Sequence, residues 1–151
     1  MAVSEAQNGS DAPDPAAIQL AEASLHRCAS TAFFQAFYRR LLVTDEVTRH
    51  KFDHTDFERQ HKLLQHGLGL LFSYAKRRNP ALLERIAVRH AKPDLDVAPS
   101  AYPHFVESLL ATVREFDPSA DPTVEDAWRR AMAPGITFMA MRYAPSAPGG
   151  D

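Results

Sequence analysis

The stretch most informative about the fold is residues 81–90, which read Ala81-Leu82-Leu83-Glu84-Arg85-Ile86-Ala87-Val88-Arg89-His90. Its apolar residues Leu83, Ile86 and Ala87 are spaced i, i+3 and i+4, so they share one face of a helix. His90 falls at i+7 on the same face, just before a segment that contains Pro93 and should end the helix. The spacing therefore predicts an amphipathic helix with a polar imidazole at the end of its buried face.

A histidine in that position needs a partner, because a buried polar group without a hydrogen bond destabilises the fold. Two interpretations fit this helix by itself. His90 is either a core residue bonded to a backbone carbonyl or a ligand for something bound in the interior. The helix alone favours the first interpretation, so the rest of the chain has to decide.

The other periodic segments also have helical spacing. Residues 33–42 carry a wide apolar stripe, made of Phe33, Phe34, Phe37, Tyr38, Leu41 and Leu42. Residues 102–113 repeat apolar side chains at i, i+3, i+4, i+7, i+8 and i+11. No convincing strand with alternating pattern occurs. The sequence therefore predicts an all-α protein of six to seven helices.

The length of 151 residues suits one domain with its own core. We expect this domain to span residues 16–143. The flanking segments, 1–15 and 144–151, are rich in small residues and proline, and we expect both to be mobile tails.

Composition excludes several classes of partner. The chain has 17 basic and 19 acidic side chains, a balance that argues against a nucleic-acid partner. No apolar run approaches the roughly 18 residues that span a bilayer, so no membrane partner is expected. The N-terminus lacks the features of a signal peptide, and Cys28 is the only cysteine. These features predict a cytoplasmic protein without a disulfide.

Three polar side chains stand on the predicted inner faces of three different helices. Tyr38 lies on the stripe of residues 33–42, Gln60 shares a face with Phe57 and Leu64, and His90 closes residues 81–90. Taken alone, each of the three could be an ordinary structural residue that binds no ligand. Together, and with Phe52 between the first two, they predict a pocket with a ligating side and a hydrogen-bonding side.

At these positions the sequence resembles the globin family. The matching pieces, in order, are Phe37-Tyr38-Arg39-Arg40-Leu41-Leu42, Phe52, Thr55-Asp56-Phe57-Glu58-Arg59-Gln60, His90, Tyr102 to Val113 and Ala127-Trp128. The resemblance covers roughly residues 16–143 and is greatest to bacterial single-domain globins and the globin domain of flavohaemoglobins. It implies a globin-like fold whose helices sandwich a haem.

The resemblance also implies roles for individual residues. Haem b (iron protoporphyrin IX) would be held by His90 through one ring nitrogen, with the other donating to the carbonyl of Ile86 or Ala87. Phe52 would pack on the porphyrin, and Tyr38 and Gln60 would face the gas on the opposite, distal side. The remaining pocket residues that the resemblance implies are Leu63, Leu64, Gly67, Ile86, Val97, Tyr102 and Phe105.

Two features of the site stay open at the level of sequence. A shift of one residue would make His61, not Gln60, the distal residue, and a distal histidine can bind iron itself. Flavohaemoglobins also place a tyrosine and a glutamate behind the proximal histidine, which strengthens its donation of electrons. Tyr102 could match that tyrosine, but the glutamate position holds Arg142 or Tyr143.

The expected function is reversible binding of dioxygen, and of nitric oxide and carbon monoxide, as a carrier, scavenger or sensor. An enzyme activity is the second interpretation, namely nitric oxide dioxygenation that depends on an external reductase. A third is a haem-free regulatory module with a globin-like fold. The sequence alone distinguishes neither carrier from sensor nor monomer from oligomer.

Overall fold

The computed structural model describes residues 14–91 and 95–143, and this part of the chain contains helices and no strand. The all-α prediction is confirmed. Seven α-helices and one 3-10 helix follow in the order α2 (Pro15–Cys28), α3 (Thr31–Leu42), α4 (Glu46–His50), α5 (Phe57–Arg77), α6 (Ala81–His90), η1 (Pro99–Ala101), α7 (Tyr102–Phe116) and α8 (Pro122–Tyr143).

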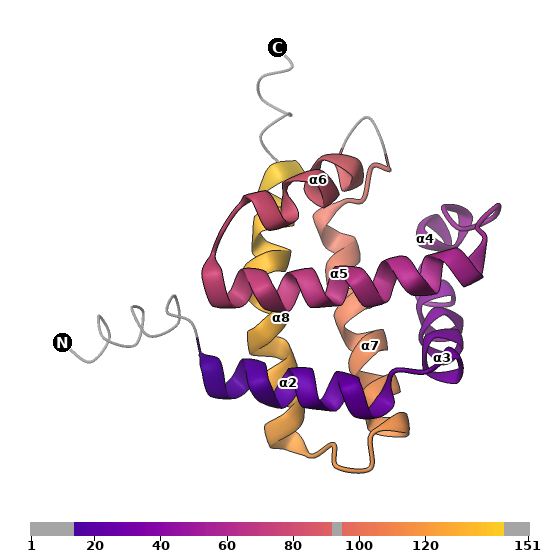
Figure 1. Cartoon of the computed structure of the whole chain (residues 1–151). Coiled ribbons are helices and arrows are strands. Elements are labelled where there is room, and N and C mark those ends of the chain that lie inside the picture. The colour runs from indigo at the N-terminus through magenta and orange to yellow at the C-terminus, as the bar shows by residue number, and fades with distance from the viewer. Residues whose placement is uncertain (1–13, 92–94, 144–151) are drawn as a thin grey trace.

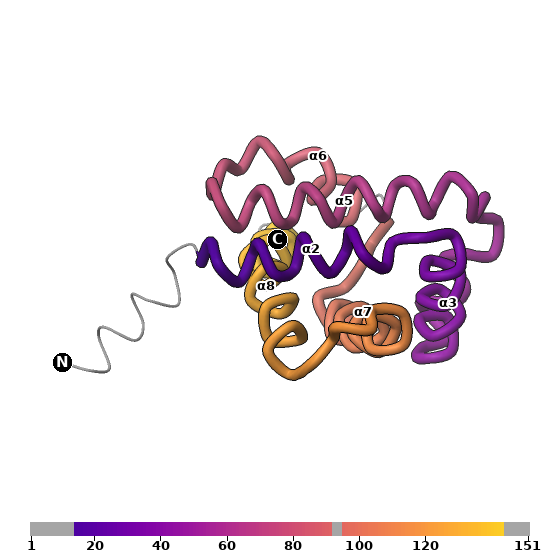
Figure 2. The backbone as a smooth tube through the Cα atoms, turned by 60° about the horizontal axis from the view of Figure 1, so that its bottom comes forward, coloured from indigo at the N-terminus to yellow at the C-terminus, as the bar shows by residue number. Residues whose placement is uncertain are grey.

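The helices cross one another in two layers (Figure 1). Helices α2 and α5 run side by side across α7 and α8, which lie behind them in that view. Helix α8 packs against α2, α5 and α6, while α3 packs against α7. Figure 2 shows α6 at the outer edge of the molecule beside α5. Of the three helices that carry the polar residues, α5 contacts both α3 and α6.

The close approach of α8 to α5 and α6 depends on Gly135. A Cβ atom at this position would overlap the side chain of Leu71 on α5 and lie 3.1 Å from Cδ1 of Leu83 on α6. On the same face of α8, Trp128 is fully buried, and its ring meets Phe72 of α5 edge to face at 5.5 Å. Any larger residue here would force the Leu71 side chain to shift, because the facing side chains already fill the space.

Capping side chains set where the helices begin. The sequence predicts Thr55 or Asp56 as the cap of α5 and Asp121 as the cap of α8. Asp56 accepts from the backbone N–H of Arg59 at 3.4 Å, and Asp121 accepts from that of Val124 at 2.8 Å. Residues 44–51 read as a polar turn in the sequence, but they contain α4. Asp45 accounts for this difference, because its carboxylate accepts from both the N–H and the hydroxyl of Thr48 and so caps a short helix.

A buried carboxylate ties the beginning of the chain to the end of α7. Asp117 is 2% exposed and accepts hydrogen bonds from the Ser24 hydroxyl at 2.6 Å and from the Arg27 guanidinium at 2.8 and 2.9 Å. The Arg27 hydrogen bond, aided by that of Ser24, lowers the pKa of Asp117 to about 2. Helices α2 and α7 are thus joined by a charged pair whose carboxylate is fully shielded from water.

The two predicted tails lie outside the described residues, except that Pro15 already opens α2 with Asp14 as its cap. Within the described residues, no helix has both the length and the apolar character needed to cross a membrane.

Candidate functional site

Helices α3 and α5 bring the two distal candidates into direct contact. The Nε2 amide group of Gln60 donates a hydrogen bond to the phenolic oxygen of Tyr38 at 3.1 Å. Tyr38 is only 5% exposed, and this burial raises its pKa to about 12. The phenol therefore keeps its proton at neutral pH. Because its oxygen already accepts from Gln60, its own O–H remains a donor for a third group.

Aromatic rings surround the Tyr38 side chain. Phe52 lies 5.6 Å from it, Phe57 5.4 Å and His61 5.7 Å, measured between ring centroids. Phe52 follows α4, while Phe57 and His61 stand one turn apart on α5. These contacts fix the orientation of the Tyr38 ring and shield the ring from water.

The His61 ring lies in the interface between α3 and α5. It stacks on Tyr38 with an interplanar angle of 16° and on Phe34 with an angle of 26°. Gln60 and His61 thus both touch Tyr38, the first by a hydrogen bond and the second through its ring face. An imidazole packed between two rings is less free to turn toward a ligand than the neighbouring amide.

On the other side, His90 ends α6 and is held by its own helix. Its Nδ1 lies 2.9 Å from the carbonyl oxygen of Ile86, one turn earlier. Burial lowers the pKa of His90, so the ring is neutral at neutral pH. A neutral imidazole that donates from Nδ1 has its lone pair on Nε2, the form that binds a metal. The bond to a carbonyl is the one expected from the sequence.

The loop after α6 and the end of α8 hold this histidine in position. The backbone N–H of Val97 donates to the carbonyl of His90 at 2.7 Å. The hydroxyl of Tyr143 donates to the carboxylate of Asp96 at 2.8 Å, and Arg142 forms an ion pair with Glu84 of α6.

These partners occupy Arg142 and Tyr143, the two residues at the expected glutamate position. In the described part of the chain, neither a carboxylate nor the Tyr102 hydroxyl hydrogen-bonds to His90. Among residues 14–91 and 95–143, the His90 ring therefore has no partner that would make it more anionic.

The other predicted pocket residues divide into three groups by exposure. Tyr102 is buried, and its burial raises its pKa to about 12. Leu63 stands apart, with 50% of its side chain exposed, because it lies about 100° around the helix from Leu64. The half-buried group comprises Phe52, Gln60, Leu64, Gly67, Ile86, His90, Val97 and Phe105.

Gly67 faces open space on the inner side of α5. A Cβ atom placed there would meet no atom within 4 Å, apart from the helix's own backbone. It stands two turns beyond Gln60 and one beyond Leu64, on the side of the helix that also carries buried Leu71. The helix face that follows the distal amide thus has room next to it, unlike the tight contact at Gly135.

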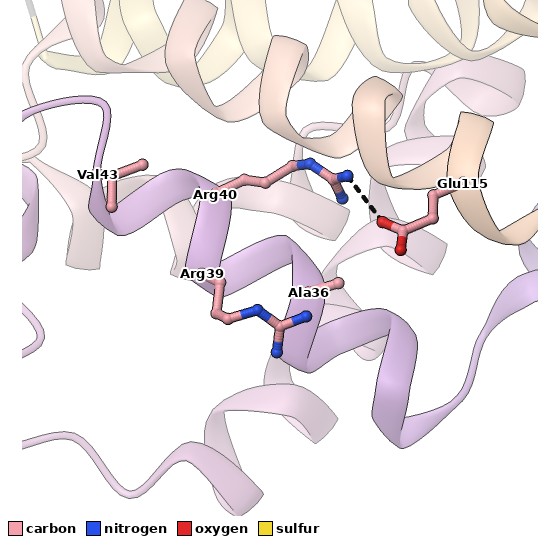
Figure 3. A pocket seen from close by; sticks show the side chains of 5 residues that line it. All are labelled: Ala36, Arg39, Arg40, Val43 and Glu115. Carbon is pink, nitrogen blue, oxygen red and sulfur yellow. Dashed lines mark hydrogen bonds and ion pairs between the residues drawn. The ribbon is translucent and has the colours of Figure 1, made fainter.

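A separate surface hollow lies between α3 and α7 and contains none of the predicted site residues (Figure 3). It is lined by Ala36, Arg39, Arg40, Val43 and Glu115. The Arg40 guanidinium donates to Glu115 at 2.7 Å and to the Thr112 hydroxyl at 3.0 Å. Its polar groups therefore bind one another, and Figure 3 shows Arg39 turned away from this pair.

Comparison with known proteins places this arrangement in a family. No model of a protein family and no curated protein matches the chain. A crystal structure of a Pseudomonas aeruginosa protein, described as structurally highly homologous to a human hemoglobin, matches with 35% identity and a TM-score of 0.81. The match covers 84% of this chain and 98% of the other. The chain belongs to the globin family.

Sequence reasoning missed some parts of this globin's site. It considered His61 only as the distal residue after a shift of one position, whereas in the structure the His61 ring contacts Tyr38 and Phe34 of α3. It also did not anticipate that Gln60 would bond to Tyr38 directly. The spacing of Phe57 and His61, one turn apart on a helix with aromatic neighbours, was the available signal for the first point.

Proposed function

We propose that this globin binds haem b, with Nε2 of His90 as the protein ligand to the iron. The observation that carries the proposal is the 2.9 Å contact between His90 Nδ1 and the Ile86 carbonyl. It selects the tautomer with a free lone pair on Nε2, and the lowered pKa of the buried ring keeps that lone pair from being protonated. A single neutral imidazole is the axial donor set that haem iron takes in globins.

The walls of the site also suit a flat apolar cofactor. Leu64, Ile86 and Val97 are half-buried apolar residues that pack against the core. Phe52 supplies an aromatic ring that packs against Tyr38, and the missing side chain of Gly67 leaves open space beside α5. An apolar lining with a few convergent polar groups is typical of cofactor pockets.

When bound, the haem supplies an iron position at which dioxygen, nitric oxide or carbon monoxide can bind reversibly. The chain's own contribution is a directed donor. Tyr38 keeps its proton, and Gln60 and the surrounding rings hold the phenol in place. A hydrogen bond from Tyr38 to a polarised gas molecule would contribute about 1 to 3 kcal/mol, and carbon monoxide, which is nearly neutral, would gain less.

The test is the absorption spectrum of the purified protein with haemin, compared with His90→Ala and His61→Ala. We expect an intense haem band in the wild type and in His61→Ala. His90→Ala should lose most of its affinity for haemin. A wild type that takes up no haemin would overturn the haem proposal and favour a haem-free module. Retention by His90→Ala with loss by His61→Ala would assign the iron to His61.

Nitric oxide dioxygenation with an external reductase is a second candidate. The Tyr38 donor favours it, because a phenol held by Gln60 stabilises polarised oxygen. The bond of His90 to a backbone carbonyl disfavours it, because that bond strengthens electron donation less than a carboxylate would. Formation of nitrate from nitric oxide with a supplied reductase would separate the enzyme from a carrier, scavenger or sensor.

A further inference from the structure

The backbone of residues 95–97 completes the hydrogen bonding at the end of α6. The last carbonyl groups of an α-helix have no partner within the helix and need one from outside. We refer to residues 95–97 as the α6 strap. Its N–H groups donate in turn to the carbonyls of Arg89, Ala91 and His90, at 2.9, 3.4 and 2.7 Å. The strap therefore binds the backbone of the proposed iron ligand, which is the last residue of α6.

Asp96, in the middle of the strap, has a backbone conformation that its position in the chain does not explain. Its φ is 55°, in the left-handed region, where a residue other than glycine is uncommon. Among the described residues Arg78 shares this feature, but Arg78 caps the end of α5, where a left-handed residue is usual. Asp96 caps no helix in that way. A residue in such a conformation persists when contacts from its surroundings hold it there.

Two side chains from distant elements supply those contacts. The hydroxyl of Tyr143, the last residue of α8, donates to the carboxylate of Asp96 at 2.8 Å, and this hydrogen bond raises the pKa of Tyr143. The ammonium of Lys51, at the end of α4, donates to the carbonyl of Leu95 at 3.1 Å. The strap is thus anchored from α8 and from α4, by residues 47 and 44 positions away in the chain.

The Lys51 anchor connects the two sides of the proposed pocket. Lys51 stands directly before Phe52, whose ring packs on Tyr38 at 5.6 Å. Its partner Leu95 belongs to the strap that binds the carbonyl of His90. Within the described residues Lys51 forms no ion pair, so the Leu95 carbonyl is its polar partner there. One ammonium group therefore ties the aromatic cluster around the distal phenol to the end of the proximal helix.

We propose that Lys51 and Asp96 are positioning residues for the iron ligand, and that with Tyr143 they keep the strap bound to the backbone of His90. The His90 ring is already bonded to the carbonyl of Ile86, so the strap fixes the part of the residue that this bond leaves free. A ligand ordered before binding loses less freedom when it binds, which favours slow dissociation. The effect on iron rests on the proposed haem function, whereas the anchoring of the strap does not.

The first test measures amide hydrogen exchange in the full chain without haemin. Tyr143→Phe and Lys51→Gln each remove one anchor, and we expect the strap amides to exchange at least about fivefold faster in both. The matched controls are Tyr74→Phe and Lys62→Gln, which remove a hydroxyl and an ammonium that have no hydrogen bond in the described part of the chain. Their strap amides should exchange within about twofold of the wild-type rate.

Two variants of Asp96 separate the side-chain bond from the backbone conformation. Asp96→Asn keeps an acceptor oxygen and tolerates the left-handed region, so its strap should exchange within about twofold of the wild type. Asp96→Gly adopts that region freely but loses the acceptor, so it should exchange as fast as Tyr143→Phe. Unchanged exchange in both anchor variants, equal acceleration in the controls, or wild-type exchange in Asp96→Gly would overturn the proposal. If circular dichroism shows that Tyr143→Phe is unfolded, Asp96→Gly replaces it.

The second measurement uses the haemin-loaded protein. The iron–histidine stretching band of the ferrous form, recorded by resonance Raman spectroscopy, reports on the bond to His90 and not on the stability of the fold. We expect this band to shift or broaden in Tyr143→Phe and Lys51→Gln. Both should also transfer haemin to excess apomyoglobin about three- to tenfold faster than the wild type. The two control variants should keep the wild-type band and transfer rate.

An unchanged band in both anchor variants would overturn the positioning role, whatever their rate of haemin transfer. A wild type that takes up no haemin would instead remove the proposed haem function. Hydrogen exchange would then still decide whether Lys51 and Tyr143 anchor the strap.

Discussion

Two side chains of this globin form a single polar unit. Gln60 donates to Tyr38, and Tyr38 keeps its proton because burial raises its pKa to about 12. The sequence placed both residues on apolar helix faces, and the resemblance to globins implied that both face the distal side. It predicted two independent donors, whereas in the structure one N–H of Gln60 is engaged with the phenol. Only the packing of α3 against α5 could reveal this bond, because it joins residues 22 apart in the chain.

The rate at which oxygen dissociates should depend on this Gln60–Tyr38 pair. Tyr38→Phe removes the group whose proton is available for a ligand, and we expect oxygen to dissociate about 5- to 30-fold faster, equivalent to about 1 to 2 kcal/mol. Gln60→Leu should speed release less, because its main contribution is to hold Tyr38. Flash photolysis and stopped-flow mixing of the ferrous protein would measure both rates.

The double variant distinguishes a coupled pair from two separate donors. If Gln60 acts through Tyr38, Tyr38→Phe/Gln60→Leu should release oxygen at about the rate of Tyr38→Phe alone. Additive effects would instead show that each residue reaches the ligand. Carbon monoxide release serves as the control and should change much less. Unchanged oxygen rates in both single variants would contradict the distal assignment.

Among the helices, α2 and α7 depend on a charged pair that the sequence did not indicate. Ser24, Arg27 and Asp117 are ordinary surface residue types, and nothing in their spacing shows that they meet. The structure buries the Asp117 side chain completely and leaves the Arg27 side chain 36% exposed. A buried carboxylate of this kind stabilises the fold only while its partners remain bound to it.

Acid should weaken this connection in a defined range of pH. The folded-state pKa of Asp117 is about 2, below its usual value of 3.8, so the ionised carboxylate favours the folded state. Its contribution, about 2 kcal/mol, is fully present above about pH 4 and is lost as the pH falls toward 2. Asp117→Asn should therefore lower the free energy of unfolding by about 2 kcal/mol at pH 7, measured by urea denaturation.

The same variant should approach the wild type in stability as the pH falls below about 2, where the wild-type carboxyl also becomes protonated. A suitable control is Asp126→Asn, which removes a carboxylate from the exposed pair with Arg130 on α8 and should cost less than about 1 kcal/mol. An Asp117→Asn protein as stable as the wild type at pH 7 would contradict this account of the α2–α7 connection.

The whole molecule should respond to haem as a folding ligand. Residues of α3, α5, α6 and α7 are proposed to line the haem pocket, so a ligand that bridged them would bind the folded state and not the unfolded chain. At a free haemin concentration of about 1,000 times Kd, linkage predicts about 4 kcal/mol of added stability. Haemin should therefore raise the unfolding temperature of the wild type by several degrees, measured by circular dichroism on heating.

His90→Ala provides the comparison for this measurement. It should unfold near the wild-type temperature without haemin and show little further rise when haemin is added. An equal rise in both proteins would mean that haemin binds somewhere other than at His90.

Local patterns were enough to predict the fold class, the longer helices and most of their ends, but not the short helix α4. Apolar spacing placed residues 81–90 on a helix, and Asp56 and Asp121 cap the helices that they were expected to begin. These features depend on neighbours within a turn or two, so they can be read along the chain. The bond from His90 to the carbonyl of Ile86 belongs to the same class, because both residues lie on one helix.

Contacts between distant segments required the tertiary structure. The Gln60–Tyr38 bond, the stacking of His61 on Phe34, the Asp117 pair and the approach of α8 at Gly135 all join residues far apart in sequence. Their residue types are common, and only the crossing of the helices selects which of them meet. The sequence by itself therefore determined which faces are apolar and where the polar candidates stand on them. The packing of those faces decided which candidates touch, because side-chain contact depends on the distance and rotation between helices.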